Sequence, residues 1–212
     1  MTNDIEKDLI ECLGLISADW KMQSNNRDKS TNFIYKAKTL AECLDLIKRN
    51  NANKDYALHR WYNYITSLKC EDLFCEYGAV HDTNIYNHNI DIYINNIPFD
   101  VKLTVYPAKL SNRPYNLNTR TGKNELIRWY YTNQSQESRK QLLNRLYVVC
   151  DGKDSYECLK LKSDFPLLRK KIEHFMSYCL KNGINSLDIV DNGKQYTVYS
   201  DIIYISYNEE EN

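Results

Sequence analysis

The chain of 212 residues is poor in glycine, and its six glycines form no glycine-rich loop, which excludes phosphate-binding loops of the P-loop or dinucleotide type. It has no G-x-S-x-G sequence and no recognisable Cys–His pattern, which excludes common nucleophilic hydrolases. No apolar run approaches the ~18 residues of a membrane span. The acidic N-terminus MTNDIEKDLIEC lacks the apolar segment of a signal peptide. We therefore expect a soluble, cytoplasmic protein with no membrane partner.

The sequence also lacks a recognisable pattern of paired cysteines. The seven cysteines are odd in number, scattered and without a C-x-x-C pair, which is typical of a reducing cytoplasm. Cys70, Cys75, His81 and His88 follow one another as C-x4-C-x5-H-x6-H, outside the common zinc-finger spacings. We expect buried thiols and exposed imidazoles there rather than zinc.

The chain has no net charge, since 28 basic residues balance 28 acidic ones. The charge is unevenly placed: residues 101–145 hold nine Lys or Arg against two acids, whereas residues 1–20 and 201–212 are acidic. A basic centre between acidic ends is compatible with a polyanion-binding face, and also with chance clustering on a solvated surface. The 18 tyrosines, against five phenylalanines, suit half-buried surfaces and stacking platforms.

Hydrophobic periodicity predicts helices first and strands later. Apolar residues at helical spacing predict helices over 3–18, 37–49, 55–77, 123–142 and 164–182. Alternating or continuous apolar residues predict strands over 79–82, 88–94, 97–106, 144–152 and 195–207. Polar residues predict a turn over 23–32, a cap at Asp55, and helix ends at Gly78 and at Asn182-Gly183. We expect a single domain with a helical extension (1–54), a core (55–152), a C-terminal helix and strand (153–207) and a disordered acidic tail (208–212).

The stretch IDIYINNIPFDVKLT, residues 90–104, places aspartates inside two predicted strands, where aspartate is normally depleted. If Asn95-Asn96 forms a two-residue hairpin turn, Asp91 lies opposite Asp100, with Cβ atoms roughly 4.5–5.5 Å apart. If Pro98 imposes a four-residue loop, Asp91 lies opposite Lys102 instead. Both registers put the three charged side chains on one face. The other face, expected in the core, carries Ile90, Ile92, Val101, Leu103 and Val105.

Two carboxylates this close repel each other unless a cation compensates. Two carboxylates with carbonyls and waters suit Mg²⁺, and a neighbouring lysine can orient or deprotonate a metal-associated water. These groups are the equipment for metal-assisted phosphodiester hydrolysis. A structural charge cluster is the alternative interpretation.

Asp91, followed nine residues later by Asp100-Val101-Lys102 on the next strand, resembles the PD-(D/E)xK nuclease superfamily. The resemblance covers residues 55–152 and implies an α/β fold with the restriction-endonuclease-like αβββαβ core. It implies that Asp91 and Asp100 bind Mg²⁺ or Mn²⁺ and that Lys102 assists the attacking water. Ile90 stands where the motif has proline, a position that is loose in the superfamily.

The resemblance also implies supporting residues. A glutamate on the helix before the first strand would complete the catalytic and metal site; Glu71 is better placed than Glu76. On the helix after the motif, Gln134 would orient a water and Arg139 would hold a phosphate. In the basic loop, the residues expected to contact nucleic acid by charge and stacking are Arg113, Tyr115, Arg120 and Lys123.

These expectations converge on a Mg²⁺-dependent nuclease acting on DNA in a restriction, repair or mobile-element setting. Cutting both strands at a symmetric site would need a homodimer or two sequential nicks. One alternative is a catalytically inactive module of the same fold for nucleic-acid binding or protein assembly. Another is a protein-interaction domain that uses its tyrosine-rich surface.

Overall fold

The structure, a computed structural model, describes residues 3–17, 25–84, 89–112, 114–133 and 143–207. The α-helices are α1 (Asn3–Leu15), α2 (Asn25–Ser30), α3 (Leu40–Arg49), α4 (Lys54–Glu76), α5 (Arg120–Thr132), α6 (Ser155–Lys162) and α7 (Phe165–Asn182). The strands are β1 (Val80–His81), β2 (Ile92–Ile94), β3 (Ile97–Val105), β4 (Arg145–Cys150), β5 (Ser186–Asp191) and β6 (Lys194–Ile205). Short 3-10 helices are η1 (Asn32–Lys36) and η2 (Ala108–Leu110).

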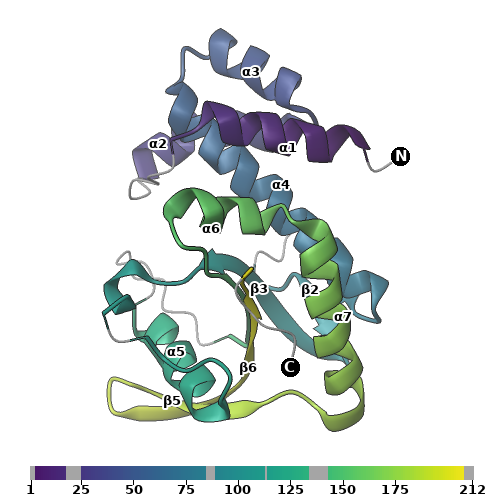
Figure 1. Cartoon of the computed structure of the whole chain (residues 1–212), viewed down its shortest axis with the longest axis vertical. Coiled ribbons are helices and arrows are strands. Elements are labelled where there is room, and N and C mark those ends of the chain that lie inside the picture. The colour runs from purple at the N-terminus through teal and green to yellow at the C-terminus, as the bar shows by residue number, and fades with distance from the viewer. Residues whose placement is uncertain (1–2, 18–24, 85–88, 113, 134–142, 208–212) are drawn as a thin grey trace.

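The strands form one mixed sheet in the order β1-β2-β3-β4-β6-β5, so the chain is of the mixed α/β class. The pairs β1–β2, β2–β3 and β5–β6 are antiparallel, whereas β3, β4 and β6 run parallel. Helix α5 lies on one side of the sheet, and α4, α6 and α7 lie on the other (Figure 1). Among the described residues, no helix has the length and apolar content to cross a membrane.

The N-terminal helices pack on the first half of α4, away from the sheet (Figure 1). The predicted turn over 23–32 is wrong, because this segment contains α2 and leads into η1. The buried side chain of Arg60 explains the difference. Its guanidinium donates to the backbone oxygen of Asp28 at 2.6 Å and to Oγ1 of Thr31 at 2.7 Å, which holds the polar segment against α4.

Helix α4 leads directly into β1, the strand at one edge of the sheet. Asn53 caps its start by accepting from the Tyr56 amide, so the predicted cap at Asp55 is wrong. Its end at Gly78 is confirmed, since Gly78 has a φ of +102° and its amide donates to the Cys75 oxygen. The next amide, of Ala79, donates to the Phe74 oxygen, which completes a Schellman end. Strand β1 follows directly.

The β2–β3 hairpin has the two-residue turn. Ile92 pairs with Phe99 and Ile94 pairs with Ile97, while Asn95 and Asn96 have φ values of 50° and 63°. These left-handed conformations fit a primed turn, which asparagine tolerates. The four-residue alternative is therefore wrong.

The two faces of the sheet carry separate clusters of buried side chains. The face under α4, α6 and α7 includes Ile92, Val101 and Leu103, as predicted, whereas Ile90 and Val105 are only partly buried. Among the described residues, the face under α5 carries a cluster of ten buried aliphatic and aromatic side chains: Leu117, Leu126, Ile127, Tyr131, Tyr147, Val149, Leu187, Ile189, Val198 and Ile202.

The C-terminal addition has more elements than the predicted helix and strand. Helix α6 and strand β5 were not predicted. The predicted end of α7 at Asn182-Gly183 is confirmed, since Gly183 has a φ of +78°. The predicted helix over 123–142 begins earlier, as α5, and residues 134–142 lie outside the described part of the chain.

Candidate active site

Asp100 lies in the middle of the sheet and is held by two cations. Its carboxylate is buried, with Oδ2 at 2.9 Å from Nε of Arg145 and Oδ1 in an ion pair with Nζ of Lys102. Parallel pairing of β3 with β4 places Arg145 directly beside Asp100. The guanidinium of Arg145 also stands over the ring of Tyr131, 5.6 Å from its centroid. The carboxylate is therefore fixed in position.

Asp91 marks the point where the β2–β3 ladder ends. Its amide donates to the Phe99 oxygen, and Phe99 is already the partner of Ile92, so Asp91 does not pair squarely with Asp100 as predicted. The Asp100 amide points toward β4 and donates to the backbone oxygen of Asn144. The next amide, that of Val101, therefore points toward β2. The Asp91 carboxylate accepts from that amide at 2.7 Å and so replaces a missing strand carbonyl.

The Asp91 carboxyl nonetheless interacts electrostatically with Asp100. Burial raises the pKa of Asp91 most, and the charge of Asp100 raises it further. The Val101 amide and the Lys102 ammonium act in the opposite direction on this pKa, because both stabilise the carboxylate. The hairpin thus brings Asp91, Asp100 and Lys102 into electrostatic contact.

Glu71 joins this group from α4. Burial raises its pKa to about 8, with further increases from the charges of Asp91, Asp72 and Asp100, while Lys102 lowers it. Glu76, the alternative candidate, forms an ion pair with Arg169 of α7 instead. Five residues apart on a helix, the two glutamates face different directions. Glu71 is the one whose charge interacts with the hairpin acids.

The cluster therefore contains three carboxyl groups and one lysine, from α4, β3 and the residue before β2. Carboxylate oxygens are the donors that Mg²⁺ prefers. Burial is the main reason that the pKa values of Glu71 and Asp91 are raised, and the neighbouring carboxylates add to it. Within the part of the chain that the structure describes, no three His, Cys, Asp or Glu side chains are arranged to hold a metal ion as they stand. Both oxygens of Asp100 already face cations, so Lys102 would have to release Oδ1 for a metal to bind there.

Two of the predicted nucleic-acid contacts, Arg120 and Lys123, are tied into the fold. Arg120 pairs with Asp201 at 2.8 Å, and Nζ of Lys123 donates to the Ile202 oxygen at 3.0 Å. Pairing of β5 with β6 stops at Tyr199, so these side chains from α5 cover the strand edge that β5 leaves open. Burial lowers the pKa of Lys123. Arg120 is half-exposed and Lys123 is partly buried, and both already have partners within the protein.

Of the remaining predicted residues, the structure describes one, Tyr115. Tyr115 lies beyond the far end of β3, where its amide donates to the hydroxyl of Tyr106 at 2.9 Å. Gln134, Arg139 and Arg113 lie outside the described residues.

The structure describes three of the four residues of the C-x4-C-x5-H-x6-H spacing. Cys70 is buried in the core, and Nε2 of His81 lies 3.2 Å from Asp72. His88 is not among the described residues.

Arg145 is the residue of this site that the sequence reasoning missed. It opens the apolar run RLYVVC, in which the other five residues are uncharged. A lone charge at the start of a strand buried along its whole length was the available signal, because a buried arginine requires a partner. The identity of that partner depends on which strand lies alongside.

Comparisons of the chain with models of protein families, with curated proteins and with solved structures found no match. Function is therefore inferred from the residues of the chain alone.

Proposed function

We propose that the protein is a metal-dependent nuclease that uses Mg²⁺ or Mn²⁺ to hydrolyse phosphodiester bonds, with DNA as the favoured substrate. The observation that carries the proposal is the ion pair of Asp100 with Lys102, together with the electrostatic interaction of Glu71 and Asp91 with this pair. The element order α4-β1-β2-β3-α5-β4, with β3 and β4 parallel, supports it too, because the PD-(D/E)xK resemblance implies an αβββαβ order.

The carboxylates of Asp91, Asp100 and Glu71 are the groups that would hold the dication. A bound Mg²⁺ supplies charge stabilisation to the phosphate and lowers the pKa of water. Lys102, with its ammonium at Asp100 and its side chain half-exposed, is placed to orient an incoming water. Burial raises the pKa of Glu71 to about 8, so this carboxyl holds its proton at neutral pH and would release it when a dication binds.

Arg145 would act as a positioning residue. Its bond to Oδ2 fixes the Asp100 carboxylate, and stacking over Tyr131 fixes Arg145 in turn. The same ion pair favours a second candidate function, a nucleic-acid-binding module without catalysis. Two cations already neutralise Asp100, so its burial needs no metal.

Cleavage assays test the proposal. Plasmid, single-stranded DNA and RNA would be incubated with Mg²⁺ and with Mn²⁺, using the natural chain and the variants Asp100→Asn and Lys102→Ala. We expect cleavage that falls by about 10²-fold or more in both variants. The control is Asp45→Asn, an exposed acid on α3 that pairs with Arg49 of the same helix, and it should cut like the natural chain.

Two outcomes would count against catalysis. One is an inactive natural chain on all three substrates with both metals. The other is cleavage that is equal in all variants, which would indicate a contaminating nuclease. Salt-dependent DNA binding that survives Asp91→Asn and Asp100→Asn in an inactive protein would favour the second candidate.

A further inference from the structure

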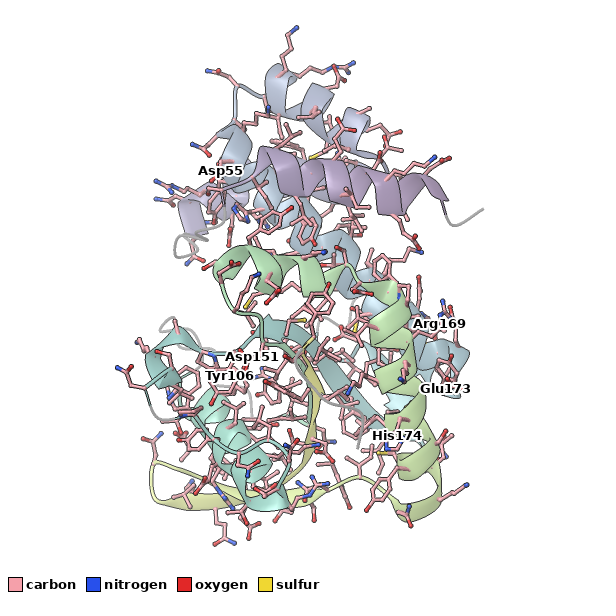
Figure 2. All side chains as sticks on the ribbon, in the orientation of Figure 1. Asp55, Tyr106, Asp151, Arg169, Glu173 and His174 are labelled. Carbon is pink, nitrogen blue, oxygen red and sulfur yellow. The ribbon has the colours of Figure 1, made fainter. Side chains whose placement is uncertain are left out.

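A pocket lies at the other end of β3 from Asp100. Because β3, β4 and β6 are parallel, their carboxyl ends meet at one edge of the sheet, where open α/β sheets commonly bind ligands. Tyr106 follows β3, Asp151 follows β4, and Tyr204 is near the end of β6. These three residues and the loop 114–118 line a pocket of about 220 Å³. Figure 2 labels Tyr106 and Asp151 there, beside α5.

The floor and the loop wall of this pocket are held in place. The Tyr106 amide donates to the Cys150 oxygen and the Asp151 amide to the Ile205 oxygen, which ties together the ends of the three strands. The loop rests on α5 at Gly122, where a Cβ atom would lie 2.0 Å from the backbone oxygen of Asn116. Only glycine permits this contact, so the wall is set by close packing.

Two side chains of the pocket, Asp151 and Tyr106, can offer a ligand a hydrogen-bond acceptor and a donor. Oδ2 of Asp151 accepts from the Tyr204 hydroxyl at 2.7 Å, which leaves Oδ1 able to accept from a ligand. The Tyr106 oxygen accepts the Tyr115 amide at 2.9 Å, so its own proton can be donated. Tyrosine rings and the side chains of Pro114 and Leu117 supply apolar lining around these polar groups.

We propose that this pocket receives one unstacked base of a single-stranded nucleic acid. Its volume is below the roughly 300–1,000 Å³ of ordinary small-molecule sites, which suits a single planar ring system. Aromatic walls suit base stacking. Each nucleobase has a donor beside an acceptor on its pairing edge, so Asp151 and Tyr106 can satisfy a base without selecting its identity. An organic cation would fit less well, because the Tyr106 proton would face a positive charge.

This inference rests on the proposed function, because it names the substrate form that the same face of the protein binds. Asp100 and Lys102 occupy alternate positions of β3, and Tyr106, the residue after β3, continues the same alternation, so the three share one face. At about 3.3 Å per residue, Lys102 and Tyr106 are separated by about 13 Å along the strand. One nucleic-acid strand can therefore reach both the acidic cluster and the pocket.

Fluorescence anisotropy of labelled single-stranded DNA in EDTA tests the proposal without cleavage. Tyr106→Phe removes the donor, and Asp151→Asn removes the charge of the acceptor while keeping its shape. Each should weaken binding roughly five- to tenfold, the loss expected for one hydrogen bond. Neither variant should alter binding to an abasic oligomer of equal length. The matched control is Tyr199→Phe, an exposed tyrosine of β6 outside the pocket, which should bind as the natural chain does.

Three results would overturn the proposal: unchanged binding in both folded variants, an abasic oligomer that binds as tightly as the intact one, or displacement by tetramethylammonium but not by adenosine. Thermal unfolding shows whether each variant folds. If Tyr106→Phe does not fold, Asp151→Asn still tests the proposal. Failure of the nuclease proposal is recognised separately. If the natural chain cleaves no substrate and yet binds single-stranded DNA in a base-dependent way, the base-binding pocket is supported and the nuclease proposal is refuted.

Discussion

Replacing Glu71 by glutamine should stabilise the protein in alkaline solution and have no effect in acid. Burial and the neighbouring carboxylates raise the pKa of Glu71 from 4.5 to about 8. Between these values the unfolded chain has released the proton and the native chain still holds it, so stability falls as pH rises. Below pH 4.5 both states are protonated and nothing is lost. Above pH 8 the full loss is present.

The size of this loss follows from the pKa difference. Each tenfold change in proton affinity corresponds to about 1.4 kcal/mol, so the free energy of unfolding falls by at most about 5 kcal/mol. Glu71 is only partly buried, and solvent screening reduces the cost, so we expect about 2–4 kcal/mol. For a chain of this size that corresponds to a rise in Tm of about 5–15 °C.

Thermal unfolding of the natural chain and Glu71→Gln at pH 4, 6 and 9 measures the effect. Glu11→Gln, an exposed glutamate of α1, is the matched control and should leave the pH dependence unchanged. Parallel curves for the natural chain and Glu71→Gln would refute the reasoning, because Glu71 would then ionise like a solvated glutamate and could not lie in a carboxylate cluster.

Three further predictions concern the structure around the site. Arg145→Met leaves Asp100 buried with one cation and should cost about 2–4 kcal/mol in urea unfolding, part of which Asp100→Asn in the same chain should restore; a neutral single variant would contradict the ion pair. Gly122→Ala places a Cβ 2.0 Å from the Asn116 oxygen and should cost about 2–3 kcal/mol; an unchanged urea midpoint would show that the loop does not rest there. Asn96, with a φ of 63°, should tolerate glycine with a gain of about 0.5–1 kcal/mol and lose about 1–2 kcal/mol as valine, and the opposite order would exclude the primed turn.

The hairpin could be predicted from the sequence because its determinants are local. Alternating apolar residues fix the faces of β2 and β3, and Asn95-Asn96 fixes the turn. The pattern could not show where the ladder ends. Asp91 leaves the register because its side chain, rather than its backbone, bonds to Val101.

Long-range partners were out of reach for a different reason. Arg145 meets Asp100 only because β4 lies beside β3, and Arg120 meets Asp201 across 81 residues. Charge counting therefore could not show that Arg120 and Lys123, predicted to contact nucleic acid, also bond to β6. Strand β5 was missed although Asn192-Gly193, a strong hairpin-turn pair, separates it from β6 and both residues have positive φ.

Calorimetric titration with Mn²⁺ tests most directly whether Glu71, Asp91 and Asp100 form one dication site. The natural chain should bind Mn²⁺ with release of protons at pH 7, because Glu71 must ionise. Asp91→Asn should abolish the site, and Asp45→Asn should keep it. No binding by the natural chain, or unchanged binding in Asp91→Asn, would contradict a shared metal site and the chemistry inferred from it.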